Sequence, residues 1–275
     1  MSECREALCA AMDGTPTVNR QDLIDRKGTP SAKTSNWLPK SEKFKDWRRS
    51  SDPVLWISSS PGTGKTMLAI ALTSYLEENY TRHTIVYFFC EALTARSTEE
   101  AIIKGLVYQL LQANKALERY ILQRFKENRN ALFTARNLGT LWTVLMNMLN
   151  DPESGNIICV LDGLDECDAE GVNHFLLKLE QLLEQDTEVL ASCSPDDSEE
   201  EKGQASSRTP AAQRLKFVIF SRESGPGRLS DYLSIQRRMR LDDEFREERF
   251  EALTQYKHKQ VENFGRRRKW SQKLR

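Results

Sequence analysis

The hydrophobic positions of the chain form short continuous apolar runs, separated by longer stretches in which apolar residues recur every three or four positions. The continuous runs end at polar or turn-forming residues and predict buried strands over 54–57, 84–90, 157–161 and 215–220. The periodic stretches predict helices over 67–79, from the capping box Ser97–Glu100 onward, and over 115–127, 138–149 and 170–185. Apolar strands that alternate with helices predict an α/β fold, with a mostly parallel sheet covered by helices on both faces.

The two ends of the chain and one internal stretch depart from this alternation. Residues 1–50 carry few periodic signals and are predicted to form an N-terminal flanking segment. Residues 191–213 are rich in Ser, Asp and Glu, so they are predicted to be a disordered insertion within a domain spanning 51–232. Residues 233–275 are highly charged and helical in pattern, and they are predicted to form a charged helical tail. The predicted fold therefore has short helical flanks at its N-terminal and C-terminal ends.

Composition limits the classes of protein and of site. Forty basic and forty acidic side chains cancel, so no global field draws the protein to nucleic acid or to a membrane. Six cysteines without a C-x-x-C pair, and only three histidines, disfavour a zinc site. Cys90 and Cys159 lie inside apolar runs and are predicted to be buried free thiols, as in a reducing compartment.

The sequence predicts a cytoplasmic protein, because it resembles neither a secreted nor a membrane-spanning chain. The first residues are polar and acidic, unlike a secretory signal. No apolar stretch approaches the ~20 residues of a membrane helix. The basic tail around Arg266–Lys269 could serve as a nuclear address or touch nucleic acid, but a solvated, frayed end is the favoured interpretation.

A glycine-rich loop follows the first predicted strand and precedes the first predicted long helix. Its residues are Ser59, Ser60, Pro61, Gly62, Thr63, Gly64, Lys65 and Thr66. Such a loop binds a triphosphate through backbone N–H groups, a helix N-terminus and the lysine charge, while the hydroxyl after the lysine holds Mg²⁺. Lys65 is therefore the predicted phosphate cation, and Thr66 a predicted Mg²⁺ ligand.

One position departs from the pattern G-x-x-x-x-G-K-[ST]. Ser59 stands where glycine is expected. A residue other than glycine costs conformational ease where the loop turns, but serine can adopt most backbone conformations. The alternative interpretation of the segment is a glycine-rich turn with a stray lysine. The strand before it and the helix after it favour the phosphate loop.

Acidic residues follow the third predicted strand. Asp162 ends the apolar run, at the strand end where ligands bind in open α/β sheets, and its carboxylate suits Mg²⁺. Asp165 and Glu166 come next and are candidates for orienting an attacking water. An ordinary strand-end aspartate is the alternative for Asp162.

An arginine follows the fourth predicted strand. Arg222 is placed at the same edge of the sheet, where it could sense a γ-phosphate or stabilise transition-state charge. The alternative is a salt bridge to a neighbouring acid.

In this order, the motifs resemble the NACHT-type NTPases of the STAND class, especially large fungal NOD-like receptors. The residues that carry the resemblance are Trp37, Phe44-x-x-Trp47, Leu55–Ile57, Pro61–Thr66, Tyr87–Phe89, Val160–Cys167 and Lys216–Arg222. The resemblance implies a signalling switch controlled by ATP or GTP. It also implies that Asp162 is the Walker B acid, that Asp165 or Glu166 is the hydrolytic residue, and that Arg222 is the sensor. The implied partners are further copies of the chain or larger NACHT relatives.

Two functions remain open from the sequence. The intact lysine, hydroxyl and acids favour slow Mg²⁺-dependent hydrolysis of ATP or GTP. Ser59 and the short C-terminal region, which indicates a truncated form, favour a non-catalytic nucleotide-binding module that works through a partner.

Overall fold

A computed structural model gives the fold of the chain. It describes residues 2–30, 37–191, 214–224, 229–233 and 237–244, with positions 254, 258 and 261. The predicted insertion, beyond its first residue, and most of the charged tail lie outside these residues.

The described residues alternate helices and strands along the chain. In chain order the elements are α1 (Ser2–Ala10), α2 (Pro16–Lys27), α4 (Trp37–Lys40), α5 (Glu42–Arg49), β1 (Val54–Ser58), α6 (Lys65–Asn79), β2 (His83–Phe89), α7 (Glu99–Ala113), α8 (Glu118–Asn128), α9 (Leu138–Asn150), β3 (Asn156–Asp162), α10 (Ala169–Ala191), β4 (Leu215–Ser221), α12 (Leu229–Leu233), β5 (Arg237–Arg240) and α13 (Leu241–Glu244). Single turns of 3₁₀-helix join several of them, among them η5 (Leu164–Glu166).

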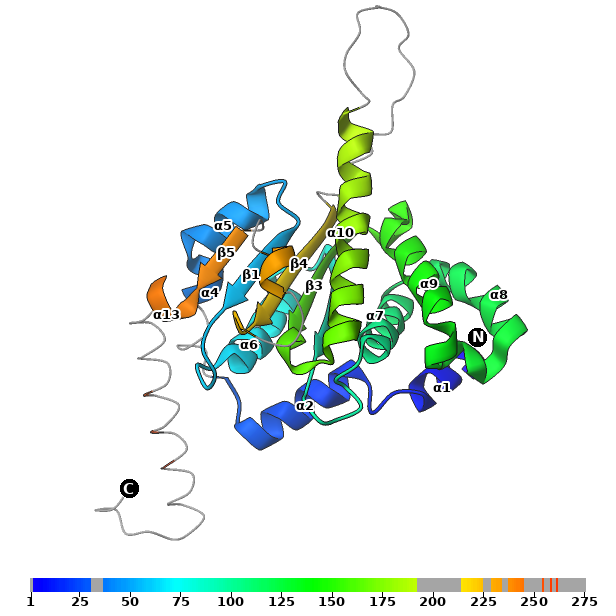
Figure 1. Cartoon of the computed structure of the whole chain (residues 1–275), viewed down its shortest axis with the longest axis horizontal. Coiled ribbons are helices and arrows are strands. Elements are labelled where there is room, and N and C mark those ends of the chain that lie inside the picture. The colour runs from blue at the N-terminus through cyan, green and yellow to red at the C-terminus, as the bar shows by residue number, and fades with distance from the viewer. Residues whose placement is uncertain are drawn as a thin grey trace, which may run out of the picture.

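The strands form one sheet in the order β2-β3-β4-β1-β5, and every neighbouring pair is parallel. Figure 1 shows β3, β4, β1 and β5 side by side, with β5 at one edge. This confirms the α/β fold with a parallel sheet. The four strands predicted from apolar runs are β1, β2, β3 and β4, and their ends agree with the prediction to within one residue.

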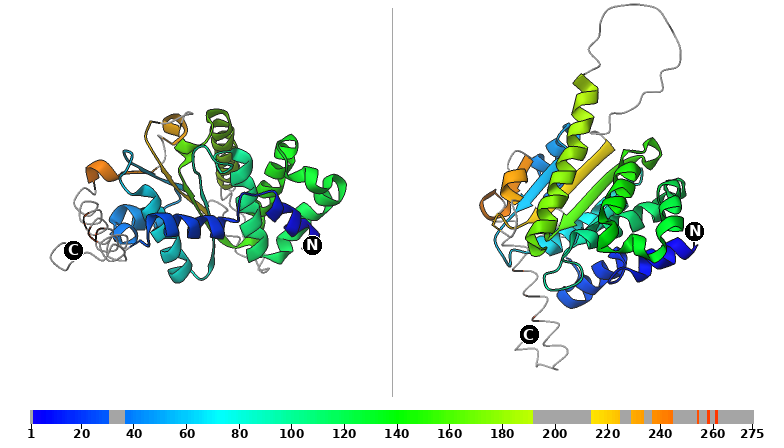
Figure 2. Two further views of the ribbon diagram at one scale, coloured as in Figure 1. Left: turned by 90° about the horizontal axis from the view of Figure 1, so that it is seen from below. Right: turned by 45° about the vertical axis from the view of Figure 1, so that its right-hand side comes forward.

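The side chains of the strands alternate between two apolar layers, because successive residues of a strand point to opposite faces. Trp56, Cys159 and Phe217 belong to the layer beneath α7, α9 and α10. Ile57 and Val160 belong to the opposite layer, with residues of α2, α5 and α6. The sheet therefore lies between two layers of helices, as the view from below in Figure 2 shows.

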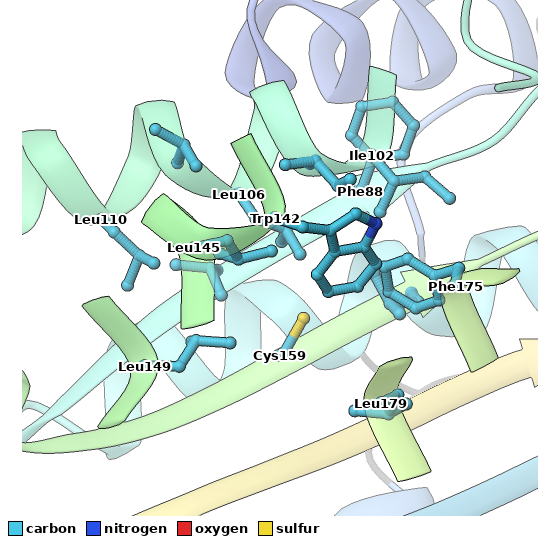
Figure 3. Close-up of a cluster of buried hydrophobic side chains, with 14 of the residues drawn as sticks. Phe88, Ile102, Leu106, Leu110, Trp142, Leu145, Leu149, Cys159, Phe175 and Leu179 are labelled. Atoms are coloured by element: carbon cyan, nitrogen blue, oxygen red, sulfur yellow. The ribbon is translucent and has the colours of Figure 1, made fainter. Parts of the chain in front are cut away.

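The larger apolar layer centres on Trp142 of α9. Its ring lies 5.3 Å from that of Phe175, and Figure 3 shows both beside Phe88 and Leu106. The indole N–H of Trp142 donates to Glu99, whose carboxylate also lies 2.6 Å from the Nδ1 atom of His174. This buried polar group links α7, α9 and α10.

The N-terminal helices belong to the same two layers. Leu8 of α1 packs in one layer, and Phe44 and Trp47 of α5 pack in the other. Lys216 of β4 is buried, and its ammonium donates to the carbonyl oxygens of Trp47, Ser50 and Asp52 at 2.6–3.1 Å. The limits at residues 50 and 232 nevertheless remain a prediction.

Two local predictions need correction. The cap of α7 is Thr98, whose hydroxyl accepts from the backbone N–H of Ala101, one residue later than the predicted capping box begins. Strand β5 lies within residues 233–275, for which the sequence predicts helix, and its sequence Arg-Arg-Met-Arg has no apolar run that would indicate a strand. An edge strand needs fewer apolar residues and often carries charges.

Cys90 and Cys159 are buried free thiols, as predicted, and burial raises the pKa of both.

None of the helices in the described part of the chain combines the length and apolar character that a bilayer crossing requires.

Candidate phosphate-binding site

The predicted site residues meet at one edge of the sheet, because β3, β4 and β1 are adjacent and parallel. The glycine-rich loop follows β1, the acidic turn η5 follows β3, and Arg222 follows β4. Two backbone hydrogen bonds join these strand ends: Ser59 N–H donates to the Ser221 carbonyl, and Gly163 N–H donates to the Phe220 carbonyl. The order of the strands therefore brings together residues that are up to 163 positions apart.

The loop turns at its two glycines. Gly62 has φ +73° and Gly64 has φ +91°, and both values lie in the left-handed region that favours glycine. A Cβ atom on Gly62 would meet nothing within 4 Å, so backbone conformation rather than crowding requires glycine there.

Helix α6 begins at this loop without a side-chain cap. Helices α2, α5 and α7 have their first turns capped by the hydroxyls of Thr15, Ser41 and Thr98. The first N–H groups of a helix need an acceptor and carry the positive end of its dipole. The uncapped start of this 15-residue helix can therefore accept an anion.

Lys65, the first residue of α6, is held inside the loop. Its Nζ atom donates to the carbonyl oxygens of Ser59 at 2.7 Å and Ser60 at 3.0 Å. Burial lowers the pKa of Lys65, while the charges of Asp165 and Asp162 act in the opposite direction. The ammonium is thus positioned at the start of α6, within electrostatic reach of both acids.

Ser59 has an unstrained backbone conformation, and its side chain contacts other residues of the loop. The non-glycine residues with positive φ in the described chain are Leu93 and Arg129, so Ser59 has an ordinary backbone conformation. Its hydroxyl lies 2.5 Å from the Thr63 hydroxyl and 3.3 Å from Lys65 Nζ. Serine is therefore accommodated at this position without a left-handed backbone conformation.

Asp162 lies at the end of β3 with only 3% of its surface exposed. Burial raises its pKa to about 7, although a hydrogen bond from the Thr66 side chain acts in the opposite direction. A nearby cation stabilises the ionised form of a carboxyl group that is buried away from water. Lys27, at the end of α2, supplies part of that effect, since its charge also lowers the pKa.

The pair of Asp162 and Thr66 fits the donor set that Mg²⁺ requires. Both offer hard oxygen atoms, and Mg²⁺ is commonly bound by one or two protein oxygens together with substrate phosphates and waters. Among the described residues, no three His, Cys, Asp or Glu side chains converge to hold a metal ion. A Mg²⁺ ion at this pair would therefore draw further ligands from phosphate or water.

Arg222 and Asp165 form a two-point contact. The backbone N–H of Arg222 donates to Asp165 Oδ1 at 3.0 Å, and its Nε atom lies 2.7 Å from Asp165 Oδ2. Asp165 is 5% exposed. The salt-bridge alternative for Arg222 thus describes this conformation, in which the guanidinium faces an acid of the site.

Glu166 lies at the rim of the site. One carboxylate oxygen accepts from the Ala92 N–H at 3.1 Å, and the other is 3.8 Å from the Arg222 guanidinium. Its side chain is about one-third exposed, unlike that of Asp165. Of the two predicted hydrolytic residues, Glu166 is the one accessible to water.

Sequence reasoning missed one residue of the site. Asp242 of α13 contacts the loop: its Oδ2 atom accepts from the backbone N–H of Ser60 at 2.7 Å. No pattern in the sequence indicates this contact, because it depends on β5 pairing with β1.

The fold and the site together define the class of the protein. A parallel five-stranded sheet flanked by helices, with a glycine-rich loop between β1 and α6, is consistent with a P-loop NTPase. Residues 33–194, more than half of the chain, match the family described as Nephrocystin 3, N-terminal, and the chain belongs to that family. The match includes the loop and the acidic turn, whereas Arg222 and Asp242 lie beyond it.

A curated relative is also similar to the chain. The vegetative incompatibility protein HET-E-1 of Podospora anserina is 28% identical over 183 residues. The alignment covers 66% of this chain but only 13% of that relative. The chain thus corresponds to a small part of the longer fungal protein.

The raised pKa of Asp162 makes stability depend on pH. Above pH 7 the folded protein must bury a charge, and this cost disappears as pH falls from about 7 toward 4, where the unfolded state also takes up the proton. We expect Asp162→Asn to raise the free energy of unfolding by about 1–4 kcal/mol at pH 8, with the gain shrinking toward pH 4. Denaturant titrations at pH 8, 6 and 4 without nucleotide or Mg²⁺ measure it.

The matched variant is Asp165→Asn, which removes the same charge from a carboxylate that Arg222 already pairs. We expect that variant to be less stable than the wild type at pH 8. Loss of stability in Asp162→Asn at pH 8 would contradict the burial cost assigned to Asp162.

Proposed function

We propose that this chain binds a nucleoside triphosphate, ATP or GTP, as its Mg²⁺ complex at the loop of residues 59–66. The observation that carries the proposal is the uncapped start of α6 beneath the anchored ammonium of Lys65. A phosphate chain there would accept from the first N–H groups of the helix and from the ammonium. Thr66 and Asp162 would hold the Mg²⁺ ion.

The charges around the loop support binding of the metal complex rather than of the free nucleotide. Lys65 and Arg222 are the cations, and Asp162, Asp165 and Asp242 act on Lys65 as opposing charges. Because these acids offset the cations, a bare triphosphate with up to four negative charges would gain little attraction. A divalent ion bound with it restores the balance.

We infer that any hydrolysis is slow and depends on Glu166. Asp165 is occupied by Arg222 in this conformation, so neither side chain is free to act on a phosphate until their contact opens. Glu166 is more exposed and is better placed to orient a water. Comparable unassisted P-loop proteins turn over on the order of 10⁻² s⁻¹ or slower.

The biological role that fits this site is a nucleotide-controlled switch of the NACHT type. Support comes from the similarity to HET-E-1, and from the contact between the loop and α13, which links the nucleotide site to the segment that follows β5. Further copies of the chain or larger relatives are the proposed partners. The alternative is a binding module without catalysis, which the Arg222–Asp165 pair favours.

The first test removes the phosphate cation. We expect Lys65→Ala to weaken binding of Mg²⁺–ATP or Mg²⁺–GTP at least about 30-fold, because charge-assisted contacts of this kind contribute about 2 kcal/mol or more. Isothermal titration calorimetry with both nucleotides measures it. The control is Lys115→Ala, which removes the same charge from an exposed lysine outside the site. Equal affinities for the wild type and both variants would place the nucleotide elsewhere.

A second test separates the enzyme from the binding module. We expect Glu166→Gln to bind the triphosphate as the wild type does, but to slow single-turnover phosphate release at least tenfold. The measurement is release of labelled phosphate with enzyme in excess, compared with Lys65→Ala as the background. If the wild type releases phosphate no faster than Lys65→Ala, the non-catalytic module is the correct description.

A further inference from the structure

The phosphate loop already holds one carboxylate, that of Asp242. Its Oδ2 atom accepts from the backbone N–H of Ser60 at 2.7 Å and from the Ser60 hydroxyl at 3.0 Å. Asp242 lies 182 positions after Ser60, in the short helix α13. A protein anion thus occupies a backbone donor in a loop built from donors for phosphate.

Strand β5 fixes the position of this carboxylate. Arg240, the last residue of β5, pairs in register with Ser58, the last residue of β1. Met239 and Leu241, on either side of Arg240, are buried in the apolar layer that also contains α6. Figure 1 shows α13 directly after β5 at that edge of the sheet. The pairing of β5 with β1 therefore positions Asp242 beside the loop.

An ion-pair group strengthens the same link. Glu223 follows Arg222 directly, and its carboxylate lies 2.8 Å from Arg238 and 2.5 Å from Arg240. The segment after β4, which carries the predicted sensor arginine, is thus joined to the strand that carries Asp242.

The loop contacts indicate which end of a phosphate chain Asp242 would face. In a P-loop the backbone N–H groups of the loop hold the α- and β-phosphates, and the lysine reaches the β- and γ-phosphates. Lys65 Nζ is anchored on the carbonyls of Ser59 and Ser60, so Ser60 lies at the lysine end of the site. The charge of Asp242 also reaches Lys65, whose pKa burial lowers and Asp242 helps to raise.

We propose that Asp242 is a specificity-determining residue that discriminates between nucleoside triphosphate and diphosphate. This inference rests on the proposed function. A diphosphate leaves the lysine end partly open, so Asp242 keeps its two hydrogen bonds to Ser60. A triphosphate brings its terminal negative charges toward the carboxylate, which repels them and must leave Ser60. The chain therefore binds diphosphate relatively more tightly, and triphosphate displaces α13 from the loop.

The test is a pair of affinity ratios. The dissociation constants of the Mg²⁺ complexes of ADP and of the β,γ-imido analogue of ATP, with the guanine pair alongside, are measured by titration calorimetry on the full chain. We expect Asp242→Asn, which keeps an acceptor for Ser60 but removes the charge, to shift the ratio toward triphosphate by roughly fivefold or more. Asp242→Ala is expected to shift it in the same direction, and covers the case in which the asparagine variant does not fold.

Asp243→Asn is the matched control, since it removes one acidic charge from the next position of α13. We expect its ratio to equal that of the wild type. An unchanged ratio in both Asp242 variants, with both nucleotides bound, would overturn the role of Asp242 and leave the proposed function intact. Absence of binding to either nucleotide by the wild type would overturn the proposed function itself. An equal shift in Asp243→Asn would show a general charge effect and would also overturn the assignment to Asp242.

Discussion

The parallel register of β3, β4 and β1 is the constraint on which the rest of the site depends. Parallel strands bring their carboxyl ends to one edge of a sheet, and here three adjacent strand ends carry Asp162, Arg222 and the phosphate loop. The bond from Ser59 N–H to the Ser221 carbonyl and the bond from Gly163 N–H to the Phe220 carbonyl extend the ladder past the strands. Apolar layers on both faces hold this register, because a shift of one residue would turn every strand side chain to the other face.

The fold and most of the site could be predicted because they rest on local signals. Continuous apolar runs identify strands buried on both faces, and glycines before a lysine identify a loop that opens a helix. Strand β5 could not be predicted, because an edge strand with three arginines has no apolar run. The contact between Asp242 and Ser60 depends on the position of that strand, so it could not be predicted from the sequence either. The side-chain contacts of Ser59 within the loop could not be predicted either, because they depend on the conformation of the loop.

In this conformation, the charged groups of the site are engaged by other groups of the protein. Arg222 contacts Asp165, Lys65 contacts two loop carbonyls, and Asp242 accepts from Ser60. A ligand that binds here must exchange some of these contacts for its own. A site of this kind changes conformation by as much as its ligand favours one arrangement over the other. That property suits a switch better than it suits rapid turnover, and it agrees with the proposed slow hydrolysis.

In the proposed function, one Mg²⁺-bound nucleoside triphosphate occupies the loop at the start of α6. Equilibrium dialysis of the wild-type chain against labelled ATP and labelled GTP, with and without Mg²⁺, tests it most directly. We expect saturable binding of at least one of the two nucleotides, at one molecule per chain, and a marked loss of affinity when Mg²⁺ is chelated. Absence of saturable binding of either nucleotide up to millimolar concentration would contradict it.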